Sequence, residues 1–197
     1  MDQSVPSGAK LGGTVPSIGS PDWACAEDIV VRRPSEADIP ALAVLFSEMQ
    51  SHYKQPVSDA AATEAAALAC RAPANTFDPR VLVALAGDAV VGSLVMNVTF
   101  PASELTLALY IRDLYVAKTV RRRGVGQMLV RAATHLRASE GFSALEWTTD
   151  SSNAAARRLY EACGARQLDR TYFNERRGVK RPVAAERRLR GGQVPTT

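Results

Sequence analysis

The stretch Arg121-Arg122-Arg123-Gly124-Val125-Gly126-Gln127 joins an apolar segment to an amphipathic one near the middle of the chain. A helix is expected to begin there, and the first turn of a helix leaves backbone N–H groups unpaired. The helix dipole favours an anion at the same place. Gly124 and Gly126 remove side chains that would block a close approach, and the three arginines add fork-shaped donors. The stretch therefore predicts a bound phosphate at a helix start.

Two familiar phosphate motifs fit this stretch less well. The pattern GxxxxGK[ST] of nucleoside-triphosphate loops is absent from the sequence. The third glycine of GxGxxG is replaced by Leu129, although Glu146 lies about twenty residues further on, as a dinucleotide-binding fold requires. The strands expected upstream are antiparallel, which does not suit that fold.

Upstream of the arginines, the sequence predicts a strand, two helices and a meander. Residues 29–33 form a short strand ended by Pro34, and Ser35 is placed to cap a helix that continues to Tyr53. An Ala-rich helix is expected over residues 58–70. Strands follow at 80–86, 89–99 and 107–117, with Gly87-Asp88 as a reversing turn between the first two. Three sequential strands with short turns indicate antiparallel pairing.

Downstream, the apolar period changes to that of helices separated by a strand. A helix from Val125 stops at Gly141, residues 144–149 form a strand, and a second helix ends at Gly164. A last strand is expected over residues 167–174. Strand–helix–strand connections of this length favour parallel pairing. The expected fold class is therefore α/β with a mixed sheet, antiparallel in its first half and parallel in its second.

Two motifs in this order resemble those of the GNAT N-acetyltransferases. Arg121-x-x-Gly124-x-Gly126 is similar to the family's R/Q-x-x-G-x-G/A signature, and Asn153-x-x-Ala156-x-x-Leu159-Tyr160-x-x-x-Gly164-Ala165 resembles its second conserved block. The resemblance covers residues 29–174. Within the family, the segment 112–116 and the strand with Trp147 look most like polyamine, diamine and small-amine acetyltransferases.

The resemblance implies acetyl-CoA as the co-substrate. It assigns the pyrophosphate to backbone groups of residues 121–127, called here the arginine loop. It also implies that the pantetheine arm pairs with the end of the preceding strand. The Val116 N–H would then face the thioester carbonyl. The cofactor-binding residues expected on this basis are Leu114, Tyr115, Val116, Arg121, Arg122, Arg123, Gly124, Val125, Gly126, Gln127, Asn153 and Tyr160.

The resemblance also makes Tyr160 the general acid for the departing thiolate, although its helical spacing alone fits a core tyrosine. Asp113 is the first candidate for the base or for binding the ammonium group. Other expected acceptor-site residues are Glu48, His52, Tyr53, Glu146 and Asp150. His135 is expected to be a surface residue. Three widely separated cysteines and no CxxC pair indicate no metal site and no disulfide framework.

The two ends of the chain differ from its middle. Residues 1–26 are rich in Ser, Gly and Pro and are expected to be a disordered leader, followed by a domain over 27–175. Residues 176–190 hold seven basic residues and one acid, so this segment carries +6 and the rest of the 197-residue chain −2. The basic tail, 176–197, reads poorly as the family's final strand, so that strand is either missing or supplied by a dimer partner.

The expected function is acetyl transfer to a primary amine of a small molecule, such as a polyamine or an amino acid. Two alternatives stay open: acetylation of a protein or peptide, and a CoA-sensing or nucleic-acid-binding regulator that uses the basic tail. Nucleic acid is the weaker expectation, because no aromatic residue follows Phe173 to stack on bases. No signal peptide or membrane span is evident, so a cytoplasmic enzyme is expected. A homodimer is expected because a partner could supply the final strand of the sheet.

Overall fold

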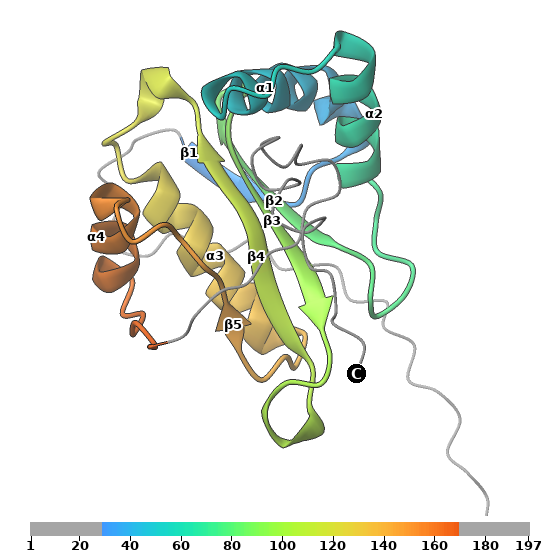
Figure 1. Ribbon diagram of the computed structural model, residues 1–197. Helices are drawn as coiled ribbons and strands as arrows, with labels where there is room; N and C mark the ends of the chain where they lie inside the picture. The colour runs from blue at the N-terminus through green and yellow to red at the C-terminus, as the bar shows by residue number, and fades with distance from the viewer. Residues whose placement is uncertain (1–28, 170–197) are drawn as a thin grey trace, which may run out of the picture. The chain divides into compact units, whose positions relative to one another are not determined.

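The computed structural model describes residues 29–169, and residues 29–165 belong to one unit (Figure 1). Residues 166–169 carry no helix or strand. The strands of the described chain are β1 Ile29–Arg32, β2 Arg80–Ala86, β3 Ala89–Thr99, β4 Ala108–Val116 and β5 Leu145–Glu146. The helices are α1 Ile39–His52, α2 Asp59–Ala69, α3 Val125–Ser139 and α4 Ala154–Ala162, with 3-10 turns η1 Glu36–Asp38, η2 Ser103–Leu105 and η3 Lys118–Val120.

The strands of this unit form a mixed sheet in the order β1-β2-β3-β4-β5. β1 to β4 are antiparallel to their neighbours, and β5 runs parallel to β4, with Leu109 opposite Leu145 and Tyr110 opposite Glu146. The predicted meander is confirmed, and so is the parallel pairing of the two strands joined through α3. The predicted α/β mixed-sheet class is therefore correct.

A β-bulge interrupts β4 at Arg112. Val95 of β3 lies opposite Asp113 and Met96 lies opposite Ile111, so Arg112 has no partner. One extra residue reverses the alternation of a strand. Before the bulge, the Leu109 N–H donates to Ala144 on the β5 side; after it, the Ala117 N–H donates to Val91 on the β3 side. The bulge thus sets which groups of the later half of β4 face which edge.

The helices cover the two faces of the sheet (Figure 1). A Cβ on Gly92 of β3 would lie 3.1 Å from Leu129 and 3.3 Å from Val125, so Gly92 faces α3. Ser93, the next residue, pairs with Tyr115, whose hydroxyl reaches Glu48 of α1. Successive residues of a strand face opposite sides. α1 and α3 therefore pack on opposite faces, and Leu42, Leu94 and Leu129, none of them exposed, lie in the core cluster between the layers.

Several helix ends follow the sequence signals. Ser58 caps α2 by accepting from the Ala61 N–H at 3.3 Å, and Gly141 follows α3 with a positive φ of 77°. Asn153 caps α4 by accepting from the Ala156 N–H at 3.1 Å. The start of the first helix differs from expectation, because Ser35 precedes the 3-10 turn η1 and α1 begins only at Ile39.

The strand predicted over residues 144–149 is wrong in length. Only Leu145 and Glu146 pair with β4, because the two strands separate beyond Tyr110. The last predicted strand, 167–174, carries no strand in its first three residues, and the remainder lies outside the described residues. The predicted leader, 1–26, and basic tail, 176–197, also lie outside them. No helix within residues 29–169 is both long and apolar enough to cross a bilayer.

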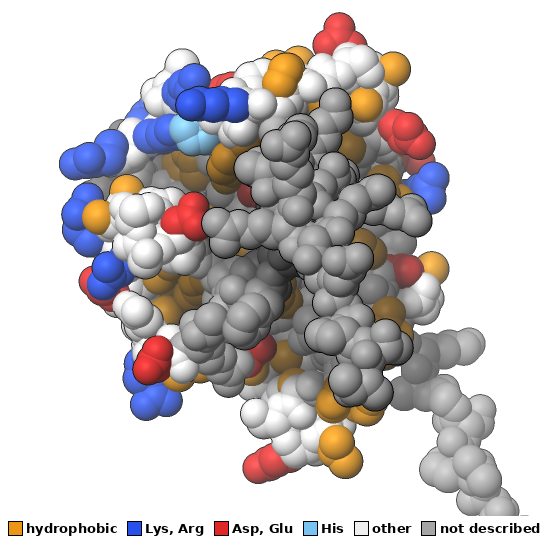
Figure 2. Space-filling view, viewed as in Figure 1, with side chains coloured by type: hydrophobic (Ala, Val, Ile, Leu, Met, Phe, Trp, Pro, Cys, Tyr) orange, Lys and Arg blue, Asp and Glu red, His pale blue; other side chains and the backbone are white. Residues whose placement is uncertain are grey.

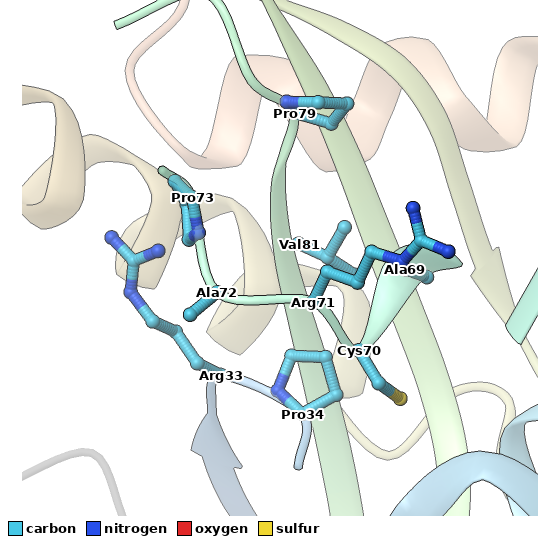
Figure 3. Close-up of a pocket in the computed structure, with 9 residues that line it drawn as sticks. All are labelled: Arg33, Pro34, Ala69, Cys70, Arg71, Ala72, Pro73, Pro79 and Val81. Atoms are coloured by element: carbon cyan, nitrogen blue, oxygen red, sulfur yellow. The ribbon is translucent and has the colours of Figure 1, made fainter. Parts of the chain in front are cut away.

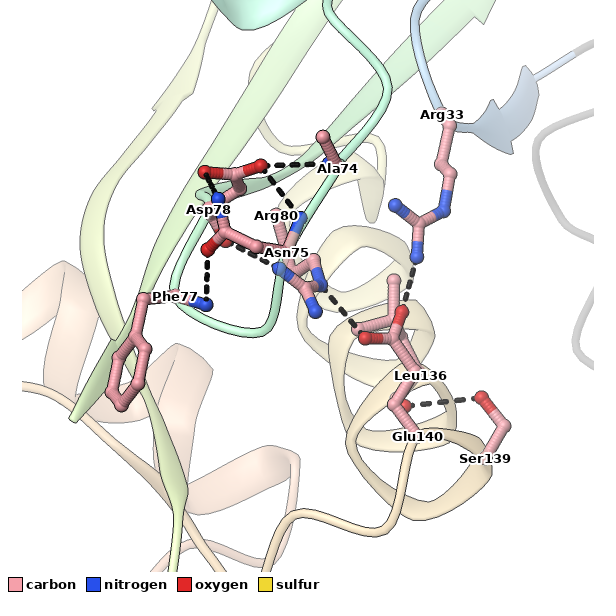
Figure 4. Close-up of polar contacts among 9 residues, drawn as sticks. All are labelled: Arg33, Ala74, Asn75, Phe77, Asp78, Arg80, Leu136, Ser139 and Glu140. Atoms are coloured by element: carbon pink, nitrogen blue, oxygen red, sulfur yellow. Dashed lines mark hydrogen bonds and ion pairs between the residues drawn. The ribbon is translucent and has the colours of Figure 1, made fainter. Parts of the chain in front are cut away.

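An ion-pair cluster lies at the C-terminal end of α3 (Figure 4). Glu140 follows α3 and accepts from Arg33 beyond β1 and from the Arg80 Nε at 2.7 Å. The Arg80 guanidinium also lies 5.6 Å from the Phe142 ring centroid and donates to the Asp78 carbonyl. The carboxylate of Asp78 in turn accepts from the Ala74 and Asn75 N–H groups. This cluster fixes the C-terminal end of α3, opposite to the arginine loop.

Candidate active site

The arginine loop lies between η3 and α3 and is turned by two residues with left-handed backbone. Arg122 has a φ of 68° and Gly124, the N-cap residue of α3, a φ of 80°. A left-handed non-glycine residue is unusual and is a hint of function. A Cβ on Gly124 would meet nothing within 4 Å, so the backbone there is open to a ligand. Successive left-handed turns and a helix start form an anion-binding concavity.

Gly126 lies close to the neighbouring helix α4. A Cβ on it would lie 3.2 Å from Leu159 of α4 and 4.0 Å from Val116. The missing side chain therefore lets α4 and β4 approach α3 closely, whereas the space beside Gly124 is the open one. Gly126 thus has a packing role besides the one expected from the sequence, and the space beside Gly124 is open.

The later half of β4 presents an open edge. Pairing with β5 ends at Tyr110, and Ile111 to Val116 continue without a β5 partner. Because the Ala117 N–H bonds to β3, alternation in the antiparallel ladder directs the Val116 and Leu114 N–H groups to the other edge. An extended ligand at this edge could pair with two N–H donors, as an added strand would.

Arg121 and Tyr115 hold the loop against the end of β4. The Arg121 guanidinium lies 5.3 Å from the Tyr115 ring centroid, and its Nε donates to the Val116 carbonyl at 3.0 Å. Tyr115 is buried, and burial raises the pKa of its phenol, helped by the carboxylate of Glu48. The spacing of the motif gives no sign that Arg121 packs on an aromatic ring of the preceding strand.

Tyr160 of α4 lies against Trp147, which follows β5. The two ring centroids are 5.0 Å apart with the planes tilted by 53°. Burial raises the pKa of the Tyr160 phenol, and Tyr53, Asp113 and Cys163 act in the same direction. Tyr160 is therefore held protonated at neutral pH. Trp147 is a neighbour that the tyrosine motif alone could not reveal, because it comes from a different element.

Asp113 of β4 acts electrostatically on Tyr53 and Tyr160. Its carboxyl is half-buried, and burial raises its pKa against the opposing effects of the Leu114 N–H and Arg112. Burial likewise raises the pKa of Tyr53, with Asp113 and Asp150 contributing and Arg121 opposing. Asp113 thus acts electrostatically on Tyr53 and on Tyr160, and Asp150 acts on Tyr53.

Three predicted acceptor residues remain, and they lie in different surroundings. His52 ends α1 with its ring 5.9 Å from Tyr115 and 5.4 Å from Tyr53, so it borders the same cluster. Glu48 is bound to Tyr115 and to the Lys118 N–H. Glu146 is exposed in β5 opposite Tyr110, before the strands separate. His135 is exposed on α3, as predicted.

Cationic side chains surround the arginine loop. Figure 2 shows Lys and Arg side chains gathered on the left of the view, where Figure 1 places α4 and the start of α3. The exposed cations of these elements are Lys118, Arg121, Arg122, Arg123, Arg157 and Arg158. Their position beside the helix start favours a ligand with several phosphates.

A small pocket lies elsewhere and is unrelated to this cluster (Figure 3). It has a volume of about 90 Å³ and is lined by the residues that follow β1, the end of α2 with the residues after it, and the start of β2, among them Arg33, Cys70 and Val81. Arg33 bonds to Glu140 at the C-terminal end of α3, whereas the arginine loop lies at its N-terminal end. Residues 29–169 contain no group of three or more His, Cys, Asp or Glu side chains able to hold a metal ion.

The mixed sheet with helices on both faces and a glycine-containing loop before α3 is typical of acyl-CoA-dependent transferases. The model of the acetyltransferase (GNAT) family matches residues 43–165, and the chain belongs to that family. It is an acetyl-CoA-dependent acetyltransferase.

One relative by sequence agrees with this assignment. An uncharacterized N-acetyltransferase, YhfO, of Bacillus subtilis (strain 168) is 28% identical over 134 residues, covering 68% of this chain and 87% of the relative.

Two solved structures share the fold. An aminoglycoside acetyltransferase, meta-AAC0020, from an uncultured soil metagenomic sample, in complex with trehalose, matches with a TM-score of 0.61 and 21% identity, covering 77% of this chain and 99% of its own. AAC(6')-Iy, in complex with the bisubstrate analog CoA-S-monomethyl-acetylneamine, matches with a TM-score of 0.62 and 15% identity, covering 76% and 99%. The closer likeness to polyamine acetyltransferases stays a prediction.

Proposed function

We propose that this enzyme transfers the acetyl group to a primary amine of a small molecule. The observation that carries the proposal is the half-buried carboxyl of Asp113, near Tyr53 and Tyr160 at the open edge of β4. A carboxylate among aromatic rings attracts an ammonium group by charge and by cation–π contact. A polyamine, an amino acid ester or an aminocyclitol all carry such a group.

The residues of the arginine loop fit the pyrophosphate of acetyl-CoA. The left-handed Arg122 and Gly124 leave space at the helix start, and the exposed arginines supply the positive charge. The Leu114 N–H would hold the pantetheine arm at the edge that β5 leaves, and the Val116 N–H would be left for the thioester carbonyl. When bound, acetyl-CoA supplies an activated acetyl group and a good leaving thiolate.

Val116 and Tyr160 are the groups that we assign to the reaction itself. The Val116 N–H is a fixed backbone donor for a carbonyl oxygen that gains negative charge, and one such donor is worth about 10²–10³ in rate. Tyr160 keeps its proton at neutral pH and can donate it to the departing sulfur. The tilted contact with Trp147 holds the ring of Tyr160 in place.

Asp113 prepares the acceptor. A protonated amine cannot attack a carbonyl, so it must first lose a proton. The raised pKa of Asp113 brings this carboxylate closer to the operating pH, which favours a base over a spectator. Tyr53 and His52 at the end of α1 would form the acceptor wall, with Asp150 as a second negative charge. We place the enzyme in the cytoplasm and expect a homodimer.

The test is thiol release from acetyl-CoA measured with a panel of polyamines, amino acids, aminoglycosides and lysine-containing peptides. The proposal predicts turnover with at least one small amine and little with the peptides. Peptide acetylation without small-amine turnover would replace it with the protein-acetyltransferase alternative.

A further inference from the structure

Glu48 of α1 makes two hydrogen bonds that cross from the acceptor side to the cofactor side. Its Oε1 accepts from the Tyr115 hydroxyl at 3.0 Å and from the Lys118 N–H at 3.0 Å. The Lys118 N–H lowers the pKa of the Glu48 carboxyl most, and the Tyr115 hydroxyl and the charges of Lys118 and Arg121 lower it further, while burial opposes them. Glu48 is therefore an ionised carboxylate at neutral pH with an engaged oxygen.

The two donors belong to the segment that leads into the arginine loop. Tyr115 is the second-last residue of β4, and Lys118 begins η3, which ends one residue before Arg121. Arg121 lies on the Tyr115 ring and bonds back to Val116. One carboxylate thus holds a strand end and a turn start, and the held tyrosine supports the first arginine of the loop.

We propose that Glu48 is a positioning residue for the cofactor loop, fixing the path from β4 to α3 through Tyr115, Lys118 and Arg121. The inference rests on the proposed function, because it concerns the loop that binds acetyl-CoA. It reassigns Glu48, which the sequence placed in the acceptor site. The two hydrogen bonds engage Oε1 in supporting the loop, so an acceptor contact of Glu48 would have to use the other carboxylate oxygen.

The physical basis is the loss of order when the carboxylate is removed. Tyr115 is 3% exposed, so its hydroxyl would lose a buried partner. The Lys118 N–H would lose its fixed acceptor, and η3 would sample other paths. A loop that is less ordered before binding must be ordered by the ligand, which weakens binding of CoA without removing any direct contact.

The experiment compares the full-length wild type with Glu48→Ala, Glu48→Gln, Tyr115→Phe and the double variant Glu48→Ala/Tyr115→Phe. Ser51→Ala, an exposed position on the same helix, is the matched control. CoA affinity is measured by calorimetry, and KM is measured separately for acetyl-CoA and for the best amine of the panel. Thermal melting reports folding.

The expected result is about tenfold weaker CoA binding in Glu48→Ala, with an acetyl-CoA KM that rises in parallel and an amine KM that stays within about twofold. Glu48→Gln keeps an acceptor oxygen and should recover part of the loss. Tyr115→Phe should weaken CoA binding in the wild type but add little in the Glu48→Ala background, because both changes break one interaction.

A raised amine KM with unchanged CoA affinity in Glu48→Ala would overturn the proposal and return Glu48 to the acceptor site. Additive effects in the double variant would also overturn it. If Glu48→Ala fails to fold, Glu48→Gln and Tyr115→Phe carry the same comparison. A wild type that does not bind CoA at all would instead contradict the proposed function.

Discussion

Gly126 of α3 packs against Leu159 of α4, so closely that a Cβ on Gly126 would lie 3.2 Å from the Leu159 Cδ2. Leu159 precedes Tyr160, the residue to which we assign proton donation. The second glycine of the arginine motif therefore controls the position of the helix that carries the catalytic candidate. The motif therefore connects the loop to α4 through packing, in addition to the phosphate binding that we propose for it.

Gly126→Ala should lower kcat more than it weakens CoA binding. The added methyl group presses on Leu159 and shifts α4, and a small misplacement of a reacting group costs about tenfold or more in rate. Helix propensity acts in the opposite direction, because Ala favours α3 by about 1 kcal/mol over Gly. The expected variant is therefore folded, slow and still able to bind CoA, as measured by initial rates, calorimetry and melting.

Two companion variants identify the cause. Gly126→Ala/Leu159→Ala should regain activity because the smaller side chain makes room for the methyl group. Gly124→Ala meets no neighbouring atom but must keep a φ of 80°, so it should cost about 1–2 kcal/mol of stability and weaken CoA binding. Equal kcat in Gly126→Ala and wild type would show that α4 tolerates the contact.

Tyr160→Phe should reduce kcat by about 10²-fold with little change in the acetyl-CoA KM, because proton donation by a positioned side chain typically contributes 10²–10⁴. Phenylalanine keeps the contact with Trp147, so folding should be unaffected. Tyr110→Phe is the matched control, since its hydroxyl bonds to Thr148 at 2.8 Å in the same region of the sheet. Wild-type turnover in Tyr160→Phe would remove Tyr160 from the mechanism.

The elements of the fold were predictable from the sequence where periodicity and end signals agree. β2 and β3 match the predicted ranges, α3 and α4 end shortly before Gly141 and Gly164, and α2 and α4 begin at the capping residues Ser58 and Asn153. The predicted length of β5 failed, because strand residues were assigned by composition while the actual strand ends where β4 bends away. That separation begins close to the Arg112 bulge, which leaves no mark in a single sequence.

The candidate site was predictable in part. Motif spacing located the arginine loop and Tyr160. It could not show the tilted ring contact between Trp147 and Tyr160 or the cation–π contact between Arg121 and Tyr115. Both contacts join residues that are far apart in the sequence or on different elements, so only the assembled sheet reveals them. Glu48 illustrates the same limit, since its neighbours are 67 and 70 residues away.

Asp113→Asn should lose activity and gain stability. The base must be ionised, so kcat/KM for the amine should rise with pH through the raised pKa of Asp113 in the wild type, and this dependence should disappear in the variant, with a loss of about 10²-fold at neutral pH. A raised carboxyl pKa means that the folded state binds the proton more tightly than the unfolded one. The ionised carboxylate therefore lowers the free energy of unfolding, and this destabilisation grows as the pH rises.

Melting curves at several pH values test the second half of that expectation. Asp113→Asn should melt above the wild type at pH 7, and the difference should vanish below about pH 4, where the wild-type carboxyl is protonated in both states. Lower stability of the variant at pH 7 would contradict an uncompensated buried charge at this position.

Asp38→Asn should destabilise the protein at neutral pH through a buried carboxylate remote from the arginine loop. Asp38 accepts from Arg32 at 2.7 and 2.9 Å and from the Ser35 N–H at 2.6 Å, and it is 6% exposed. The Arg32 guanidinium is the largest cause of a pKa held well below the usual value, and the Ser35 donors add to it. Replacing a charged acceptor in such a set costs about 1–3 kcal/mol.

The pH dependence of that loss has a definite sign. A depressed carboxyl pKa contributes stability that is present above the unfolded value, near 3.9, and that is lost as the pH falls toward the folded value. Urea unfolding should therefore show the full deficit of Asp38→Asn at pH 7, and a shrinking one from about pH 4 downward. Glu64→Gln, an exposed position on α2, should stay within about 0.5 kcal/mol of the wild type. A deficit in Asp38→Asn that is constant down to pH 2 would mean that packing, and not the ion pair with Arg32, stabilises the start of α1.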